Sequence, residues 1–444
     1  MKGSRKTIQF VLLIIIVAAG IGATFYYLEW GKPGITLDKP FDTVGKSRDV
    51  TITLSDNRSG IRSYSVAVVQ GGQSRIVAEE VLPSKGNLEK VLPLKIVPKD
   101  LRLKDGEAVF SVKVTDFSPL KNTTLYEAKI TIDSIPPRIA LLSSAHNVNP
   151  GGTCLAVYRI SKPVLSSGVK CGDAFFPGYL VQGTGRPYYV CYFAVPRDVS
   201  RTTAMTVTAA DRAGNEASTG IPFYIRSNRP FRKDTVNLGD AFVQQKAVEF
   251  QEQESSLAGK TPTEVFAYVN GTLRAANDAK IRSVCAKTDG KRLWQGTFIR
   301  MKNSAPKAMF GDERTYLYQG VSLGNSVHLG VDLASLAQSP VEAANAGTVI
   351  FADVLGIYGN CVIIDHGQGV SSLYGHLSSL AVKEGDQVAR GQVIGNSGAT
   401  GFAGGDHLHF SVLVGGVFVD PKEWWDPHWI KDNVDKKLAI AGTL

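Results

Sequence analysis

The sequence has few cysteines and no long run of basic residues, although its net charge is +9 over 444 residues. Five cysteines are too few for a fold built on disulfide bonds. Without Lys/Arg runs, the positive balance gives no indication of nucleic acid as a partner. The apolar fraction is 43% and the charged fraction 20%, which excludes a mostly disordered chain, a collagen-like repeat and a polytopic membrane protein. The length predicts about three domains.

One apolar run without charges lies near the N-terminus, at residues 8–28. A helix of this length crosses the roughly 30 Å hydrocarbon core of a bilayer. Cations precede the run, and aromatic residues at its far end are typical of a membrane interface. A cleaved secretory signal is the alternative, but its apolar core is usually shorter. We expect residues 1–31 to form a cytoplasmic tip and a single-pass anchor in the inner (cytoplasmic) membrane, with the remaining chain in the periplasm or another extracytoplasmic space.

Residues 32–226 are predicted to be β-structure. Short runs of alternating or β-branched residues are separated by clusters of Gly, Asn, Asp and Pro. A weak internal repeat relates the segments 112–116 and 207–211, each of which precedes a turn and a further apolar run. Each copy has the size of a β-sandwich. We therefore expect two Ig-like β domains, at residues 32–135 and 136–226.

Residues 227–290 are predicted to form a helical linker, arranged as a helical hairpin. Apolar residues at helical spacing follow residue 237, and Thr261 and Glu264 have the spacing of a capping box at a helix start. Residues 291–426 return to short β runs with Gly-rich turns, and residues 427–444 are expected to be a C-terminal tail. The predicted fold class is mainly β, with an N-terminal transmembrane helix, two Ig-like sandwiches, the hairpin and a C-terminal β-sheet domain.

Histidines occur in three short motifs of the C-terminal domain: His328-x-x-x-Asp332, His376 after a glycine, and His407-x-His409. Residues i and i+2 of a strand point to the same face, so His407 and His409 share a face. Three protein ligands and a fourth position open to water are typical of a catalytic zinc site. Imidazole and carboxylate groups are ligands that suit Zn²⁺.

The order of these motifs resembles the lysostaphin-type zinc endopeptidases, which cut the peptides of bacterial peptidoglycan. The resemblance extends from about residue 314 to residue 426 and includes His328-x-Gly330-x-Asp332, Gly359-Asn360-x-Val362-x-Ile364-x-His366-Gly367, Tyr374-Gly375-His376-Leu377, Gly398-Ala399-Thr400-Gly401 and His407-Leu408-His409-Phe410. It implies one zinc ion per chain, bound by His328, Asp332 and His409. It also implies that His376 and His407 are catalytic histidines, and that residues 291–426 form an antiparallel β-sheet metallopeptidase domain. One departure is Ser411, where many relatives carry an acidic residue.

The resemblance implies a membrane-anchored zinc metalloendopeptidase that hydrolyses stem peptides or cross-links of peptidoglycan. A catalytically inactive regulator of other cell-wall hydrolases is one alternative, because some relatives have lost their metal ligands. A wall-binding structural protein is another. All five key residues are present, which favours the enzyme. We expect no nucleic acid as a partner, and the upstream domains or helices are expected to cover part of the substrate groove.

The other histidines and cysteines are interpreted as structural. His366 is expected to order a turn, and His146 and His428 are expected at the surface. Cys285 and Cys361 are interpreted as packed thiols. In an oxidising compartment, two further cysteines of the second β domain could pair, and the sequence does not choose among Cys154, Cys171 and Cys191.

Overall fold

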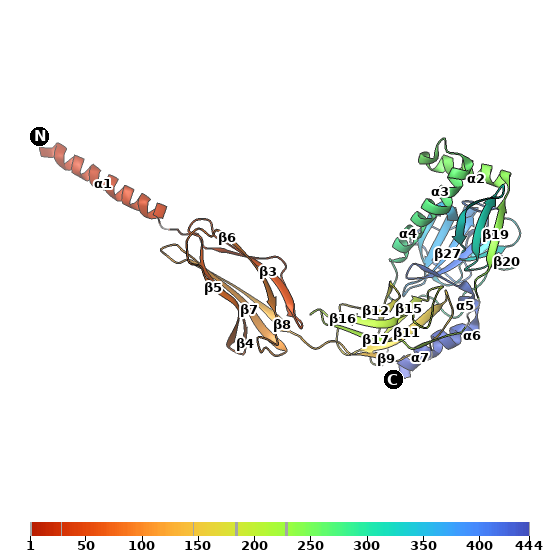
Figure 1. Ribbon diagram of the computed structural model, residues 1–444, viewed down its shortest axis with the longest axis horizontal. Helices are drawn as coiled ribbons and strands as arrows, with labels where there is room; N and C mark the ends of the chain where they lie inside the picture. Colours follow the sequence, from red (N-terminus) through yellow and green to blue (C-terminus); the bar gives the residue numbers. More distant parts are fainter. Residues whose placement is uncertain (1, 28, 145, 183–184, 227–229, 444) are drawn as a thin grey trace. The chain divides into compact units, whose positions relative to one another are not determined.

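The structure is a computed structural model that describes residues 2–27, 29–144, 146–182, 185–226 and 230–443 (Figure 1). Strands outnumber helices in the described chain, which confirms the predicted mainly β class. The chain divides into two compact units. The first unit contains Met1–Pro137 and Ala210–Glu216, and the second contains Arg138–Ala209 and Ala217–Leu444. The domain boundaries proposed from the sequence stay predictions.

The N-terminal helix α1 (Lys2–Tyr27) contains most of the long apolar run. Across the residues that the structure describes, no helix is both long and apolar enough to cross a membrane. The transmembrane helix expected within residues 1–31 is therefore not supported. Part of that segment lies outside the described side chains, at residues 1–7, 21 and 23–28.

The first unit holds two β-sheets around one apolar core. Alternation of apolar and polar residues along the strands turns one face of each sheet inward, and Ile52, Phe110 and Val112 are buried in the shared core. Ig-like topology stays a prediction. The sheets have the orders β1 (Gly34–Leu37)-β3 (Arg48–Ser55)-β6 (Glu89–Ile96) and β2 (Thr43–Val44)-β8 (Thr123–Ile132)-β7 (Gly106–Asp116)-β4 (Ile61–Gln70)-β5 (Gln73–Val81).

The second unit begins with a pair of four-stranded sheets. Strand β11 (Thr153–Ile160) of one of them is buried along most of its length. A short parallel pair, β10 (His146–Val148) and β18 (Phe223–Ile225), closes one end. The sheets have the orders β14 (Tyr179–Val181)-β15 (Tyr188–Ala194)-β11 (Thr153–Ile160)-β9 (Ile139–Leu141) and β13 (Ala174–Pro177)-β12 (Ser166–Cys171)-β16 (Met205–Ala210)-β17 (Glu216–Gly220).

The segment predicted as a helical linker contains helices and one strand. The helices are α2 (Asp240–Gln253), α3 (Pro262–Tyr268) and α4 (Arg274–Cys285), with a π-helical turn η2 (Val269–Leu273) between the last two. The predicted capping box forms, because Thr261 and Glu264 bond reciprocally at the start of α3.

The strand β19 (Lys233–Leu238) corrects the prediction that residues 227–290 are only helical. It pairs in parallel with β21 (Glu313–Tyr318), which pairs with β22 (Val321–Val327). No side chain of β19 is buried, so its apolar pattern is weak. Its partner strand lies far along the chain, and a local pattern cannot reveal such pairing.

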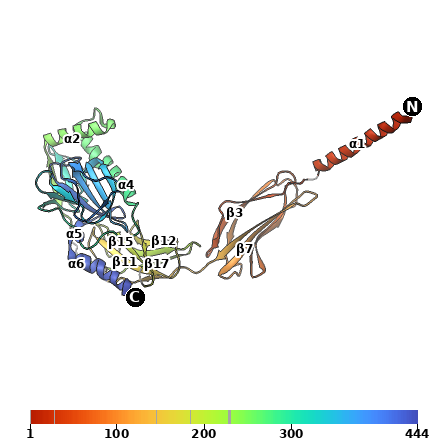
Figure 2. The same cartoon turned by 180° about the vertical axis from the view of Figure 1, so that it is seen from behind.

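A large antiparallel sheet forms the centre of the C-terminal domain. Its strands β26, β27 and β31 are buried on both faces, because α2–α4 cover one face and the other packs in the main core of the second unit (Figures 1 and 2). The strand order is β20 (Ala305–Ala308)-β23 (Val331–Ala334)-β31 (Leu408–Val414)-β27 (Val370–Leu377)-β26 (Asn360–Asp365)-β25 (Gly347–Val354)-β29 (Gln387–Val388), and β32 (Val417–Val419) also pairs with β31. A smaller sheet has the order β24 (Pro340–Glu342)-β30 (Val393–Asn396)-β28 (Ser379–Leu380).

The chain end is helical rather than a simple tail. The elements are α5 (Pro421–Trp425), α6 (Pro427–Ile430), the π-turn η4 (Lys431–Asp435) and α7 (Lys436–Thr443). Trp429 and Val434 are buried against the second unit's core, and Lys437 Nζ donates to the Leu155 carbonyl oxygen of β11 at 3.0 Å. These contacts dock the C-terminal helices on the sheets of the second unit.

Two further expectations need correction or completion. His146 is buried rather than at the surface, since its Nδ1 donates to the Pro222 carbonyl oxygen at 3.0 Å. Burial lowers its pKa to about 4. Each of the five cysteines is a buried free thiol, so Cys154, Cys171 and Cys191 form no disulfide. His366 is buried and holds a turn through Ala346, as expected, and His428 is exposed.

Candidate metal centre

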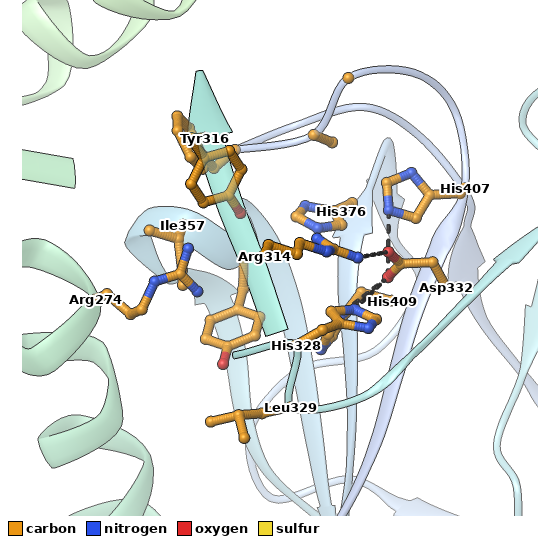
Figure 3. A pocket seen from close by; sticks show the side chains of 14 residues that line it. Arg274, Arg314, Tyr316, His328, Leu329, Asp332, Ile357, His376, His407 and His409 are labelled. Carbon is orange, nitrogen blue, oxygen red and sulfur yellow. Dashed lines mark hydrogen bonds and ion pairs between the residues drawn. The ribbon is translucent and has the colours of Figure 1, made fainter. Parts of the chain in front are cut away.

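Neighbouring strands of the large sheet bring the sequence-predicted site residues together (Figure 3). Asp332 on β23 is directly opposite His409 on β31. His409 is also opposite Gly375 on β27, and the next residue of β27 is His376. His328 lies in the turn that leads into β23, and its backbone N–H donates to the Asp312 carbonyl oxygen.

Three of these side chains point their ligand atoms at one another. His328 Nε2 and His409 Nδ1 each lie 2.9 Å from Asp332 Oδ1, and the two nitrogens are 3.1 Å apart. All three residues are buried. Zn–N bonds of about 2.0–2.1 Å place tetrahedral ligand atoms about 3.3 Å apart, so the spacing is close to that of ligands around one zinc ion.

The protonation of the two imidazoles follows from their outer partners. His328 Nδ1 donates to the Met309 carbonyl oxygen at 2.9 Å. Ser411 Oγ donates to the Leu329 carbonyl oxygen and lies 3.0 Å from His409 Nε2, so it accepts the proton of that nitrogen. Both inward nitrogens therefore carry lone pairs, as in metal sites whose histidines donate outward to a fixed acceptor. Three acceptors that face one another without a proton repel unless a cation lies between them. The donor set and its outer partners thus fit zinc.

The Gly330 position explains the glycine of the His-x-Gly-x-Asp motif. A Cβ at residue 330 would lie 2.5 Å from Ser411 Oγ and 2.6 Å from His409 Nε2. No side chain fits there unless the His409 ring or its hydroxyl acceptor moves. The glycine is therefore required by the close approach of the chain to a ligand side chain.

His376 and His407 lie beside the three ligand candidates, with ring centroids 4.8 Å apart. Each donates through Nδ1 to a carbonyl oxygen at 2.8 Å, of Thr400 for His376 and of Gly405 for His407. Each Nε2 therefore carries a lone pair, and that of His407 lies 3.6 Å from Asp332 Oδ1. His376 has a φ of +63°, a left-handed conformation that is unfavourable for histidine and that clusters at functional sites.

The charges of the site push the pKa values of its groups apart. Burial raises the pKa of Asp332, but the surrounding histidines outweigh it and hold this pKa well below the usual range. Burial and the neighbouring histidines hold the pKa of His376 well below its usual value. Burial lowers the pKa of His407, yet the nearby Asp332 carboxylate favours the charged imidazole, outweighs burial and raises this pKa overall. Two adjacent imidazoles thus differ in basicity, as general acid–base sites require.

Sequence reasoning missed several residues that line the 170 Å³ cavity at the metal centre. Arg314 on β21 donates from Nη2 to Asp332 Oδ2 at 3.2 Å, which leaves Oδ1 directed at the two ligand nitrogens. Tyr316 on β21, Tyr358 and Arg274 on α4 also line the cavity. Arg274 and Tyr316 come from segments without a local motif, and only the sheet and helix packing places them there.

The region that contains this site is similar to known peptidases. The profile of Peptidase family M23 matches residues 326–421, which contain all five predicted site residues. The DD-carboxypeptidase/endopeptidase Mpg of Neisseria meningitidis is 42% identical over 95 residues, which cover 21% of this chain and 22% of that protein. The peptidoglycan DD-endopeptidase ShyA of Vibrio cholerae is 42% identical over 89 residues, which cover 20% of this chain and 21% of that protein.

A solved structure, the catalytic domain of the antimicrobial peptidase lysostaphin from Staphylococcus simulans, is 31% identical, with a TM-score of 0.23. The match covers 27% of this chain and 90% of that one. The chain spans about a fifth of the length of the two curated relatives. The likeness is therefore one of a single domain, and the C-terminal domain of this chain belongs to peptidase family M23, the lysostaphin-type family.

Proposed function

We propose that this protein is a zinc metalloendopeptidase that hydrolyses peptide bonds in the stem peptides or cross-links of bacterial peptidoglycan. One observation supports the metal above all: the inward atoms of His328, Asp332 and His409 converge within 3.1 Å of one another, while the outer nitrogens of both imidazoles have their own hydrogen-bond partners. The substrate class is supported by the family and by the peptidoglycan DD-endopeptidase among the relatives. The proposed complement is one zinc ion per chain.

Zinc bound at these ligands supplies a water of lowered pKa and polarises the scissile carbonyl. The protein's own groups handle the protons. His376 Nε2 is free to accept a proton, because Nδ1 already donates to Thr400. His407 Nε2 can likewise hold a proton and donate it to an oxyanion or to the leaving amine. Arg314 holds the outer oxygen of Asp332 and so keeps the inner oxygen aimed at the metal position.

The experiment compares zinc content and muropeptide release for four alanine variants of the zinc-loaded chain. Asp332→Ala and His409→Ala remove ligands, so both zinc and activity should be lost. His376→Ala and His407→Ala should keep zinc near one per chain, and activity should fall by about 10²–10⁴-fold because proton transfer is lost. His407→Ala losing its zinc while His409→Ala keeps it would reverse the two assignments.

The same assay separates the enzyme from its main alternative. A wild-type chain with one zinc ion that releases no muropeptide, yet stimulates another wall hydrolase, would contradict the proposed activity and indicate a regulator. A chain that binds purified sacculi without either effect would indicate a structural wall-binding protein.

We further propose that the catalytic domain acts outside the cytoplasm, where peptidoglycan lies, and that residues 1–31 attach the chain to the inner membrane with the N-terminus in the cytoplasm. Exposed apolar side chains between Ile8 and Val17 support an apolar partner for α1. Fractionation of cells should recover the intact chain with membranes after a high-salt wash, and protease added outside the inner membrane should cut it. A soluble chain that begins after residue 30 would contradict the attachment.

A further inference from the structure

The cavity at the metal centre contains a guanidinium group that forms no close ion pair with any described residue. Arg274 reaches the cavity from α4, on the side opposite the predicted ligands (Figure 3). The other arginine of the cavity, Arg314, is paired with Asp332 at 3.2 Å. Among the described residues, no carboxylate lies at ion-pair distance from Arg274, although the charge of Asp278, one turn further along α4, acts on it. The hydrogen bonds of its guanidinium within the described chain run from Nε and Nη2 to Asn270. A guanidinium group without a close ion pair that lines a small cavity can bind an anionic ligand through charge-assisted hydrogen bonds.

A π-helical turn fixes the direction of this guanidinium. The turn η2 separates α3 from α4 and ends one residue before Arg274. Its Asn270 accepts from Arg274 Nε through the carbonyl oxygen at 3.3 Å and from Nη2 through Oδ1 at 3.1 Å. Asn270 is itself buried and donates to the Asn325 carbonyl oxygen of β22 at 3.2 Å. Such π-turns inside helices occur frequently at functional sites, and this one holds one edge of the guanidinium while Nη1 stays free for a ligand.

Helix α4 is also docked firmly on the cavity wall. Asn277, one turn after Arg274 and on the same helix face, accepts the backbone N–H of Ile357 through Oδ1 at 2.9 Å. A Cβ at Gly356 would lie 2.4 Å from the same oxygen, so the loop and the helix are in direct contact. Ile357 and Arg274 line the same cavity. The position of the guanidinium relative to the metal centre is therefore set by packing and not by a free side chain.

We infer that Arg274 is a specificity-determining residue that binds a free carboxylate of the substrate next to the scissile bond. This inference rests on the proposed function and narrows it. In a DD cross-link the residue that supplies the amine of the scissile bond carries a free α-carboxylate, whereas a glycine bridge continues as a neutral amide chain. A guanidinium and a carboxylate form a charge-assisted pair of fixed geometry. Arg274 and the three ligand candidates line the same cavity of 170 Å³, so one substrate residue bound there faces both. The preferred bond is accordingly one whose leaving residue bears an α-carboxylate.

The test uses the zinc-loaded full chain and two cross-linked muropeptides that differ in one group. Both contain a D-Ala–diaminopimelate cross-link, and the α-carboxylate beside the scissile bond is free in one and amidated in the other. The wild type should cleave the free form with a kcat/KM about 10–100-fold higher, as expected for a hydrogen-bonded charge pair. Arg274→Gln should lose this preference by slowing only the free form, and Arg274→Lys should keep part of it.

Arg282→Gln is the matched control, because Arg282 lies two turns further along the same helix, is exposed and does not line the cavity. It should behave like the wild type with both substrates. Equal wild-type rates on the two muropeptides, or an Arg274→Gln variant that slows both by the same factor, would overturn the inference and leave the proposed function intact.

If the wild type cleaves neither muropeptide, the proposed function is overturned. A binding measurement still tests the carboxylate site in that case. The amidated and free muropeptides are titrated into the wild type and into Arg274→Gln, and the Kd is measured by calorimetry. The free form should bind the wild type about 10-fold or more tightly than the amidated form, and the variant should bind both alike. Equal Kd values in the wild type would contradict a carboxylate site at Arg274.

Discussion

The described residues contain two clusters of three buried side chains that could each hold a metal ion, one in each unit. In the C-terminal domain, the cluster consists of His328, Asp332 and His409, whose inward atoms all carry lone pairs. In the first unit, it consists of Glu29, Asp56 and Asp116. In both clusters the ligand atoms all lie within 4.8 Å of one another. The clusters differ in ligand type, because the first unit offers only carboxylates, and in the surrounding hydrogen bonds.

The carboxylates of the first unit are held by nearby hydrogen-bond donors, which for Asp56 and Asp116 come from their own turns. Asp56 Oδ2 accepts the backbone N–H of Gly60 at 2.6 Å. Asp116 Oδ1 accepts both the N–H and the hydroxyl of Ser118, at 3.1 and 2.7 Å. Glu29 Oε2 accepts a backbone N–H at 3.1 Å. These donors stabilise the charges without an ion. At the C-terminal cluster Arg314 holds the outer oxygen of Asp332, and the inner oxygen faces the two imidazole nitrogens. Whether a cluster binds a metal ion therefore depends on the groups that face its ligand atoms, more than on the nearness of the ligand residues alone.

The largest expected effect comes from Gly330→Ala, which sharpens the account of the C-terminal cluster. The new methyl group would displace His409 or Ser411, and the ligand geometry would be lost. Zinc affinity should fall by about 100-fold or more, with activity falling in parallel. Gly290→Ala is the control, since a Cβ there meets nothing within 4 Å. Competition with a zinc-selective dye measures the affinity, and unchanged zinc binding in Gly330→Ala would contradict the role of this glycine.

A smaller effect is expected from Ser411→Ala, which removes the acceptor of the His409 Nε2 proton. The imidazole keeps its position but loses the partner that fixes its tautomer, so zinc affinity should fall by about 10–100-fold. Ser371→Ala, at an equally buried position of the neighbouring strand β27, should leave zinc affinity unchanged in the same dye competition. Equal affinities for the two variants would contradict the proposed tautomer.

A substitution in the acidic cluster of the first unit should lower the stability of that unit and leave the zinc content of the chain unchanged. Both oxygens of Asp116 accept hydrogen bonds, Oδ1 from Ser118 and Oδ2 from the side-chain amide of Asn122. Asp116→Asn replaces one of these oxygens by an NH2 group, which then faces a donor. Unfolding in urea should show a loss of about 1–3 kcal/mol in the free energy of the first unit. The exposed Asp49→Asn serves as the control. A change in zinc content on Asp116→Asn would break the distinction between the two clusters.

The smallest effect concerns the buried Glu423, which joins the C-terminal domain to the neighbouring β-sheets. It accepts from Asn149 Nδ2 at 2.7 Å and from the Thr153 N–H at 2.6 Å, and burial raises its pKa from 4.5 to about 8 against these hydrogen bonds. Between pH 4.5 and about 8 the carboxyl of Glu423 is therefore protonated in the folded state and ionised in the unfolded state. The contribution of this group to the free energy of unfolding is full below pH 4.5 and is lost as the pH rises toward 8.

The variant Glu423→Gln should remove this dependence. The free energies of unfolding of wild type and variant, measured by thermal unfolding, should be most similar near pH 5. At pH 8–9 the variant should be more stable by about 1–3 kcal/mol. A wild type whose stability relative to the variant rises with pH would contradict the raised pKa.

The sequence alone led to the C-terminal family and to the five candidate residues, because these residues stand in short motifs whose strand spacing is local. His407 and His409 share a strand segment, so their common face follows from two-residue periodicity. The capping box at Thr261 was predicted for the same reason, since it spans one helical turn.

What the sequence did not reveal depends on contacts between distant segments. Strand β19 pairs with residues about 80 positions later, and His146 is buried through Pro222. Arg274 has no motif of its own, and only a π-turn and the docking of α4 place it in the cavity. The covering of the groove by the upstream domains or helices stays a prediction, although Arg274 of α4 lines the cavity.

The most direct test of the account is the zinc content of purified full-length protein, measured by atomic emission for the wild type, Asp332→Ala and Asp116→Ala. Each aspartate belongs to a cluster whose ligand atoms lie within 4.8 Å of one another. Asp116 accepts a hydroxyl of its own turn, whereas Asp332 faces the imidazole of His409. The account predicts one zinc ion in the wild type, almost none in Asp332→Ala and one in Asp116→Ala. Zinc retained by Asp332→Ala, or lost from Asp116→Ala in a folded chain, would contradict it.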